Sequence, residues 1–148
     1  MQIKFRPIAK EDLKTLVAIN NMVQTNPWTQ EAIKNEIERG KGWVATSLRD
    51  QKEEITGYIF VREVSPELEI MTLAVALEYQ RNGVGQKLLG EVIKKSSKVG
   101  QIWLEVSHTN EAALSLYKKM GFETFNTRKA YYPDGTDAVC MKLKLAKT

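Results

Sequence analysis

The sequence predicts a mixed α/β fold in which helices cover both faces of one sheet. Seven segments have the alternating or continuous apolar pattern of strands, and four have apolar residues at helical spacing. Between residues 68 and 129 the two kinds of segment alternate, which is typical of a sheet layered with helices. The expected strands are 3–5, 43–48, 54–64, 68–75, 102–106, 124–129 and 138–145, and the expected helices are 13–23, 30–39, 84–99 and 111–120.

The first half of the chain begins with a short strand, because apolar and polar residues alternate before Pro7. Apolar residues then recur every three or four positions over 13–23. Thr29 is suited to be the N-cap of the second helix, and Gly40 supplies its stop. Two β-rich runs follow, joined by the polar segment 49–53. They predict a hairpin with a longer loop.

The second half opens with residues 68–75, which carry apolar side chains on both faces, as a central strand does. The helix that follows has an apolar stripe, and Gly100 is expected to end it. Asn110 is placed to cap the next helix. Gly121, followed by an aromatic residue, is typical of a Schellman cap. A turn at 133–135 then leads into the last strand.

Length and composition predict a single domain, 1–148. A chain of 148 residues with 43% hydrophobic and 27% charged side chains can form one core without disulfides. No repeat or linker-like segment divides it. Cys140 is the only cysteine and His108 the only histidine, so the chain cannot build a four-ligand Cys/His zinc site. We expect no metal.

The charge balance is mildly basic, with 22 Lys and Arg against 18 Asp and Glu, or +4. This balance is compatible with an anionic ligand or an RNA-rich neighbourhood. The basic residues are scattered, which favours a solvated surface and no direct nucleic-acid partner. The N-terminus lacks an apolar signal region, and no stretch approaches the ~18 apolar residues of a membrane span. We therefore expect a cytoplasmic protein that does not contact membranes.

A glycine-containing turn between a strand and a helix predicts an anion site. In the run Gln80-Arg81-Asn82-Gly83-Val84-Gly85, glycines let backbone amides approach a phosphate, and the helix N-terminus adds partial positive charge. Neither nucleotide motif fits. The phosphate loop needs Lys and Ser or Thr after its last glycine, and the Rossmann motif needs a glycine where Leu88 stands. The alternative is a tight turn without a ligand.

The glycine run belongs to a longer pattern, which resembles the GNAT superfamily of N-acetyltransferases over essentially the whole chain. Its other parts are Leu73-Ala74-Val75, Trp103-Leu104-Glu105-Val106, and a helix motif with Asn110, Ala113, Leu116, Tyr117 and Gly121-Phe122. Within the superfamily, Pro27-Trp28-Thr29 and Tyr131-Tyr132-Pro133 resemble the RimI-type ribosomal-protein alanine acetyltransferases. The resemblance implies a mostly antiparallel, twisted sheet.

The resemblance also implies an acetyl-CoA site. The backbone of 73–75 would bond the pantetheine arm and the thioester, and the loop 81–86 would wrap the pyrophosphate. The implied residues are Leu73, Ala74, Val75, Arg81, Asn82, Gly83, Val84, Gly85, Gln86 and Asn110. One residue departs from the pattern: Leu77 stands where the family often has proline, so we expect a less rigid loop.

Two residues match the family's catalytic positions. Glu105 matches the base, and its place between Leu104 and Val106 on a central strand predicts a partly desolvated carboxylate, which is a better base. The alternative is a strand-end glutamate in a salt bridge. Tyr117 matches the residue that protonates the coenzyme sulfur. Its alternative is a core aromatic with one hydrogen bond.

Three further residues carry side chains that could react. Glu69 is a second candidate base, and we favour a role in orienting water or the substrate amine. His108 falls in a loop where the family pattern has no histidine, so a catalytic role is disfavoured. Cys140 lies in the last strand between Val139 and Met141, where a buried thiol is usually inert. An acyl-cysteine mechanism is therefore not expected.

The expected acceptor is the N-terminal α-amine of a ribosomal protein that starts with alanine or serine. An α-amine has a pKa near ~7.7–8.0 and a lysine near ~10.4, so one modest base suits the former. Trp28, Tyr131 and Tyr132 would line the peptide cleft; the alternative is ordinary loop aromatics. Two other functions stay open: acetylation of a small amine or a lysine side chain, and a non-catalytic CoA-binding module.

Overall fold

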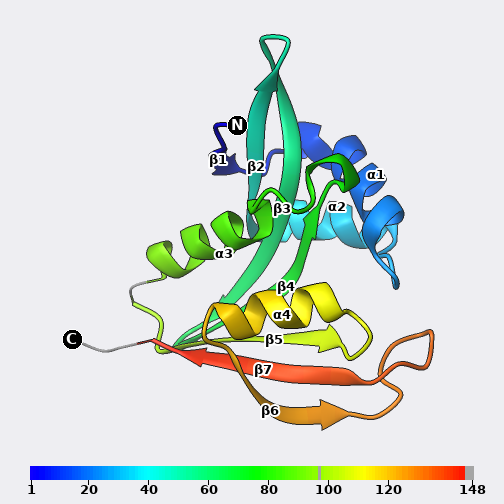
Figure 1. The fold of residues 1–148 in the computed structure, drawn as a ribbon, viewed down its shortest axis with the longest axis vertical. Coiled ribbons are helices and arrows are strands. Elements are labelled where there is room, and N and C mark those ends of the chain that lie inside the picture. The colour runs from blue at the N-terminus through cyan, green and yellow to red at the C-terminus, as the bar shows by residue number, and fades with distance from the viewer. Residues whose placement is uncertain (97, 146–148) are drawn as a thin grey trace. The chain divides into compact units, whose positions relative to one another are not determined.

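Seven strands form one sheet within residues 1–96 and 98–145, which the computed structural model describes (Figure 1). Their order across the sheet is β1-β2-β3-β4-β5-β7-β6. Only the β4–β5 pair is parallel among the strand pairs whose register the described residues define. The strands are β1 (Lys4–Pro7), β2 (Lys41–Arg49), β3 (Lys52–Val64), β4 (Glu67–Val75), β5 (Gln101–Ser107), β6 (Glu123–Arg128) and β7 (Ala138–Lys144). The mixed, mostly antiparallel sheet confirms the predicted fold class.

Four helices and two 3₁₀ turns accompany the strands in the described part of the chain. The helices are α1 (Leu13–Val23), α2 (Gln30–Arg39), α3 (Val84–Lys95) and α4 (Glu111–Lys119), and the turns are η1 (Lys10–Asp12) and η2 (Leu77–Tyr79). None of these helices is long and apolar enough to cross a bilayer.

The elements fall into two compact units. The first comprises Met1–Val61 and Thr72–Val92, and the second comprises Arg62–Met71 and the chain from Ile93 onward. The first unit therefore holds β1, β2, α1, α2 and most of β3 and α3. The second holds β5, α4, β6, β7 and the beginning of β4.

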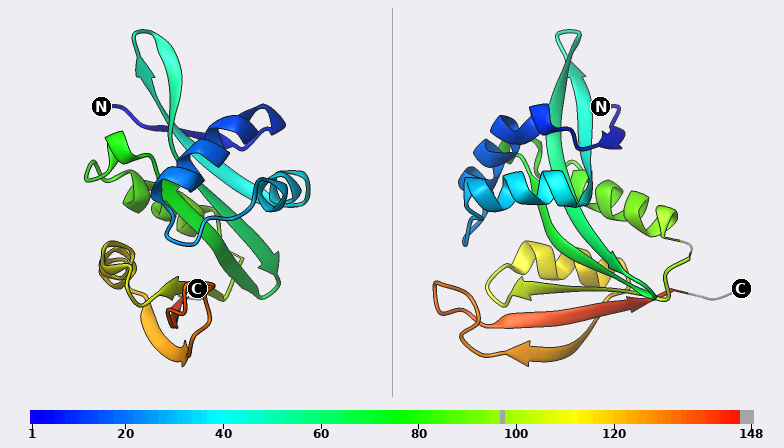
Figure 2. Two further views of the ribbon diagram at one scale, coloured as in Figure 1. Left: turned by 90° about the vertical axis from the view of Figure 1, so that its right-hand side faces the viewer. Right: turned by 180° about the vertical axis from the view of Figure 1, so that it is seen from behind.

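In the first unit, helices pack on both faces of the strands. Helices α1 and α2 lie on one face of β2 and β3, and α3 lies on the other (Figures 1 and 2). A close approach at Gly57 permits the α3 contact: a Cβ there would lie 2.8 Å from the Ala74 carbonyl oxygen and 3.2 Å from side-chain atoms of Val84 and Leu88. The first unit's core is formed by fully buried side chains, among them Leu16, Ile33, Val44, Tyr58, Ile59, Phe60, Leu88 and Leu89.

The ends of α1 and α2 lie where the sequence predicts them. The Thr29 hydroxyl accepts a hydrogen bond from the Ala32 backbone N–H at 3.1 Å, which caps α2. Gly40 follows the last helical residue, and its N–H donates to the Glu36 carbonyl. Both helix predictions are confirmed.

The β2–β3 connection is shorter than the predicted loop. Arg49 pairs with Lys52, so only Asp50 and Gln51 form the turn. Both have positive φ, 52° and 65°. Two left-handed residues in a two-residue turn match the twist of the strands that they join. The prediction was wrong because Asp and Gln, unlike Asn-Gly, signal such a turn weakly.

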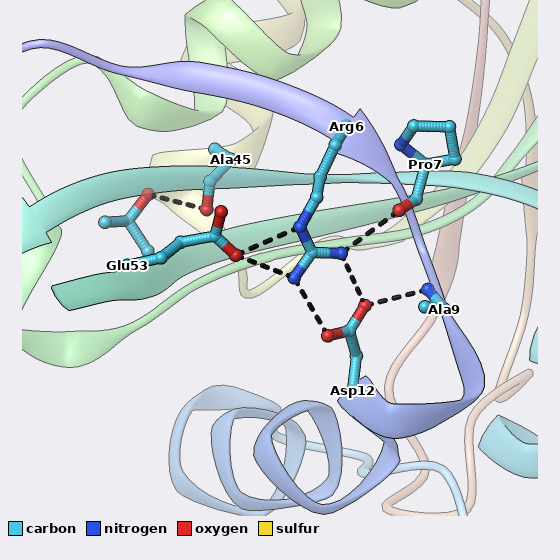
Figure 3. Close-up of polar contacts among 7 residues, drawn as sticks. Arg6, Pro7, Ala9, Asp12, Ala45 and Glu53 are labelled. Atoms are coloured by element: carbon cyan, nitrogen blue, oxygen red, sulfur yellow. Dashed lines mark hydrogen bonds and ion pairs between the residues drawn. The ribbon is translucent and has the colours of Figure 1, made fainter.

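Arg6 ties the start of the chain to this hairpin (Figure 3). Its guanidinium makes two hydrogen bonds to the carboxylate of Asp12, at 2.8 and 3.0 Å, and one to Glu53 at 3.0 Å. Asp12 also accepts a hydrogen bond from the Ala9 backbone N–H at 2.8 Å. These contacts hold β1, η1 and β3 together.

In the second unit, β7 pairs with β5 on one side and with β6 on the other. Every second residue of β5 is buried, so Ile102, Leu104 and Val106 point to one face, and Glu105 points to the other. Glu105 is registered with Cys140 of β7, which is registered in turn with Asn126 of β6. This register sets the neighbours of the Glu105 side chain.

Helix α4 has both predicted caps. The Asn110 side chain accepts a hydrogen bond from Ala113 N–H at 3.1 Å. At the other end Gly121 has φ +99°, its N–H donates to Lys118, and the Phe122 N–H donates to the Tyr117 carbonyl. This is the hydrogen-bond pattern of a Schellman cap.

Helix α3 ends earlier than predicted. Its last residue is Lys95, not a residue next to Gly100. The Ser96 N–H bonds to the carbonyl of Ile93, and the Val99 N–H bonds to that of Ser96, so the chain has left α-helical geometry. No apolar side chain lies between Ile93 and Val99 to hold a further helical turn against the core.

Candidate active site

In the first unit, the end of β4 leads through η2 into the loop that precedes α3. Arg81 and Gly83 have positive φ, 68° and 77°, and no described atom lies within 4 Å of the place where a Cβ on Gly83 would stand. The Asn82 side chain donates to the carbonyls of Tyr79 and Gln80 at 3.2 and 3.1 Å. The Asn82 side chain therefore stabilises the loop, while the position of a Cβ on Gly83 faces open space. Val84, Gly85 and Gln86, expected in the loop's anion site, form the first turn of α3.

The residue that departs from the family pattern, Leu77, opens the turn η2 and is 61% exposed. The turn is closed by hydrogen bonds from Tyr79 N–H to the Ala76 carbonyl and from the Tyr79 hydroxyl to Glu54, both at 2.9 Å. The Gln80 side chain also donates to the Val75 carbonyl at 3.1 Å. These bonds restrain the segment without proline.

The backbone of β4 has a side-chain partner that the sequence analysis missed. The amide of Gln24 donates to the Thr72 hydroxyl at 3.1 Å and lies 3.5 Å from the Leu73 carbonyl oxygen. Gln24 directly follows α1, and its sequence position alone gives no signal of this contact. Trp28, which follows Gln24 closely in the sequence, stacks on Phe60 with 6.2 Å between ring centroids.

In the second unit, Glu105 is half enclosed and surrounded by donors. Its side chain is 14% exposed, and Oε2 lies 2.8 Å from Nε of Arg128. The Cys140 thiol donates to the same oxygen at 3.7 Å. Tyr131 is close enough to Glu105 for the carboxylate charge to act on its hydroxyl. The structure therefore shows Glu105 as one half of a salt bridge, while its role as a base stays a prediction.

Tyr131 and Tyr132 lie in the turn between β6 and β7, with 5.1 Å between ring centroids. The turn is closed by hydrogen bonds from Gly135 N–H to the Tyr132 carbonyl and from Tyr132 N–H to the Thr136 carbonyl. The charge of Glu105 raises the pKa of Tyr131. Burial, and then the charge of Glu105, raise the pKa of Tyr132 to about 12. Both hydroxyls therefore keep their protons at neutral pH.

Tyr117 lies on α4 and is 6% exposed. Its ring contacts Phe122, with 5.6 Å between centroids. Burial raises the pKa of Tyr117 well above its usual value, and the neighbouring Tyr132 adds to the effect. The phenol is therefore held in its neutral, proton-donating form. This inward orientation is the one predicted from the helix face.

Glu69 is half-buried on β4 and pairs in register with Trp103 of β5. Its charge contributes to the raised pKa of Tyr131. Registered residues point to the same face, so Glu69 and Glu105 lie on one face of these strands. Asn110, by contrast, uses its side-chain oxygen to cap α4.

The two residues for which the sequence disfavours a catalytic role have structural partners. His108 Nδ1 accepts a hydrogen bond from the Asp137 backbone N–H at 3.0 Å, which ties the loop before α4 to the start of β7. Cys140 is 2% exposed, and burial raises the pKa of its thiol. Within 1–96 and 98–145, no group of three or more His, Cys, Asp or Glu side chains is arranged to hold a metal ion.

Arg128 is a second site residue that the sequence analysis missed. It pairs with Glu105, and its guanidinium lies over the Tyr131 ring at 5.5 Å from the centroid. The strand register brings Arg128 close to Glu105. Arg128 lies opposite Ala138 of β7, two residues from Cys140, which is the partner of Glu105. That register depends on a bulge in β6 between Thr124 and Asn126, which the sequence does not reveal.

The whole fold is similar to solved structures. The crystal structure of the ribosomal-protein-S18-alanine N-acetyltransferase from Escherichia coli superposes with a TM-score of 0.88 and 27% sequence identity, over 99% of this chain and 96% of that one.

Two relatives extend the similarity at the level of sequence. The chain is 32% identical over 141 residues to the ribosomal protein bS18-alanine N-acetyltransferase of Escherichia coli strain K12, covering 91% of this chain and 93% of that protein. It is 36% identical over 120 residues to the uncharacterised protein ML0378 of Mycobacterium leprae, covering 79% of this chain. The chain spans only about a third of that protein's length, since the match covers 33% of it.

A family model describes the same region in more general terms. Residues 13–122 match the model of the acetyltransferase (GNAT) family. The match includes the β4 end, the glycine loop, Glu105 and Tyr117. Because it covers well over half of the chain, and the Escherichia coli relative is matched almost end to end, this chain belongs to the acetyltransferase (GNAT) family.

Proposed function

We propose that the protein transfers an acetyl group from acetyl-CoA to the N-terminal α-amine of a protein. The observation that carries this proposal is the half-enclosed Glu105 beside the Tyr131 hydroxyl, in a chain of the acetyltransferase family. The similarity to ribosomal protein alanine N-acetyltransferases supports a ribosomal acceptor that begins with alanine, and we propose serine as a second possible first residue. We also propose a cytoplasmic location.

The first unit offers groups that fit a coenzyme A diphosphate. The N-terminus of the twelve-residue helix α3 provides backbone N–H groups and partial positive charge. The open side of Gly83 lets an anion approach them, and Arg81 supplies a formal charge. The backbone of Leu73–Val75 would bond the pantetheine arm. Bound acetyl-CoA supplies the acetyl group as a thioester.

Glu105 is proposed as the base that accepts the proton of the attacking amine, through a water molecule. Its low exposure strengthens its interaction with a nearby cation, because few waters screen it. Glu69, on the same face, is proposed to orient the amine or that water. A direct transfer in a ternary complex needs no nucleophile from the protein, which agrees with an inert, buried Cys140.

Tyr117 matches the family position that protonates the leaving thiolate, and here it is proposed to stabilise that thiolate as a hydrogen-bond donor. Its raised pKa keeps the proton on the phenol at neutral pH, and its burial keeps competing water away. A thiolate with an ordinary pKa near ~8.5 is a weaker base than the Tyr117 phenolate, so Tyr117 stabilises the departing sulfur chiefly by donating a hydrogen bond.

Each unit has aromatic side chains that are proposed, separately, as acceptor contacts. Trp28 presents a half-buried indole held on Phe60, and Tyr131 and Tyr132 present hydroxyls that can bond a peptide backbone. An α-amine with a pKa near ~7.7–8.0 is neutral in roughly one molecule in eight at pH 7. Little help from a base is then required.

Mass spectrometry tests the proposal directly. The protein is incubated with acetyl-CoA and peptides that begin with alanine, serine or methionine, each with one internal lysine. Acetyl on the α-amine of the alanine or serine peptides supports the proposal. Acetyl on lysine, or on polyamines in a parallel panel, moves the acceptor to another class. Bound acetyl-CoA without turnover, unchanged by Glu105→Gln, would indicate a non-catalytic binding module.

A further inference from the structure

The ion pair between Arg128 and Glu105 lies where the proposed reaction needs a free carboxylate. Arg128 Nε is 2.8 Å from Glu105 Oε2, the same oxygen that accepts from the Cys140 thiol. The two side chains are exposed by 52% and 14%, so the arginine reaches inward from solvent to a more enclosed carboxylate. A cationic acceptor that approaches Glu105 must compete with this guanidinium.

The guanidinium is held in place by more than the carboxylate. It lies over the Tyr131 ring, 5.5 Å from the centroid, within the range of a cation–π contact. The neighbouring basic residues are engaged elsewhere: Lys129 pairs with Asp137 at 3.4 Å, and Lys142 lies over the Phe125 ring at 5.2 Å. Among these three basic residues of the described chain, Arg128 is therefore the one that pairs with Glu105.

We propose that Arg128 is a specificity-determining residue, which pairs with Glu105 and thereby disfavours strongly basic amines, almost all of which are protonated at neutral pH, as acceptors. The pair is neutral as a unit, so it offers little attraction to an incoming ammonium. An α-amine can enter in its neutral form, whereas a lysine is neutral in only about one molecule in 2,500 at pH 7. The inference rests on the proposed function, and it names the group that selects α-amines within that site.

The test compares two peptides that each carry one acceptor. One begins with a free alanine and contains no lysine; the other is acetylated at its N-terminus and contains one internal lysine. The ratio of kcat/KM for lysine over α-amine is measured for the wild type and for Arg128→Gln. We expect the ratio to rise about fivefold, the effect of a favourable, partly exposed ion pair.

Two further variants test whether the effect comes from the Arg128–Glu105 ion pair itself or from the general loss of a positive charge on this segment. Arg128→Lys retains a cation that can reach Glu105, so the ratio should stay within about twofold of the wild type. Lys129→Gln removes a charge from the next residue, whose side chain is 85% exposed, and should leave the ratio unchanged. An unchanged ratio in Arg128→Gln, or an equal rise in Lys129→Gln, would overturn the proposal.

A binding measurement tests the role of Arg128 without turnover. The carboxyl carbon of Glu105 is followed by ¹³C NMR while n-butylammonium is added to the protein. We expect the apparent Kd to be about fivefold lower for Arg128→Gln than for the wild type. Equal affinities, or no response at Glu105 in either protein, would refute the role of Arg128. Failure of the proposed function alone would show as a wild type that acetylates no α-amine while this difference in affinity persists.

Discussion

Asn20 holds both backbone groups of Trp28. Its side-chain oxygen accepts from the Trp28 N–H at 3.0 Å, and its side-chain nitrogen donates to the Trp28 carbonyl at 2.9 Å. Asn20 is 1% exposed, so these bonds are shielded from water. A side-chain amide can make both bonds to one backbone unit in only one orientation. The two bonds therefore hold the segment between α1 and α2 in place, and with it the Trp28 ring.

Replacing Asn20 by alanine should destabilise the protein by about 2 kcal/mol, because two buried backbone groups lose their partners. The matched control is Asn21→Ala. Asn21 is exposed and accepts one bond from Asn20 at 3.0 Å, so its loss should cost under ~0.5 kcal/mol. Urea unfolding followed by tryptophan fluorescence measures both. Equal effects of the two changes would contradict this account.

The Arg6–Asp12 pair should make stability depend on acidic pH. Burial of Asp12 opposes its charge, but hydrogen bonds from Arg6 and Ala9 prevail and lower its pKa below the usual 3.8. A lowered pKa gives stabilisation that is fully present at neutral pH and is lost as the pH falls through the folded-state value. Asp12→Asn should therefore cost about 2–3 kcal/mol at pH 7, and the difference from the wild type should shrink below about pH 4.

Urea unfolding at pH 7, 5 and 3.5 checks this expectation. Glu53→Gln is the control, since Glu53 binds the other side of the same guanidinium but is 50% exposed. It should change the free energy of unfolding by less than about 0.5 kcal/mol. A difference between Asp12→Asn and the wild type that stays constant over this pH range would argue against the assigned role.

Two glycine-to-alanine changes should have opposite signs. Gly121 has φ +99°, and a Cβ there would lie 3.3 Å from the Leu143 side chain, so Gly121→Ala should destabilise by about 1 kcal/mol or more. Gly90 lies inside α3 with no described atom within 4 Å of its Cβ position, so Gly90→Ala should stabilise by about 0.5–1 kcal/mol. Thermal unfolding distinguishes the signs. A gain in Tm for Gly121→Ala would show that the left-handed cap is not required.

Helix ends and strands were predictable from sequence where one local signal dominated. Thr29, Asn110 and Gly121 each occupy the cap position that their side chains favour, and the structure places them there. The errors lie where competing signals are weak. The turn at Asp50 and Gln51 needs two left-handed residues that are not glycine, and its geometry is set by the twist of the paired strands.

The candidate site was predictable as a set of residue types, but its pairings were not. The pattern around Glu105 identifies a carboxylate on a central strand. That this carboxylate meets Arg128 depends on the register of three strands and on one bulge, which are tertiary properties. Gln24 is a similar case, because its bond to Thr72 joins positions 48 residues apart.

Tyr117→Phe should lower kcat by about 10²-fold with little change in KM, since the hydroxyl is proposed to act on the leaving sulfur only as the bond breaks. Because the pKa of Tyr117 is raised, no loss of activity from its ionisation is expected up to about pH 10. Steady-state rates with a chromogenic thiol reagent, from pH 6.5 to 9.5, test both points. Phe122→Leu is the control, because it alters the packing against the ring and keeps the hydroxyl.

Glu105→Gln should lower kcat/KM for an alanine-initiated peptide by about tenfold at pH 7, because only about one α-amine in eight is neutral there and the base deprotonates the rest. The deficit should shrink as the pH rises past the acceptor's own pKa near ~8, because a larger share of the amine then arrives neutral and needs no base. Glu69→Gln, on the same face, should show a smaller loss with the same pH dependence as the wild type. Rates for the three proteins are compared between pH 6.5 and 9.5. A deficit in Glu105→Gln that stays constant over this range would mean that Glu105 positions the acceptor and does not take its proton.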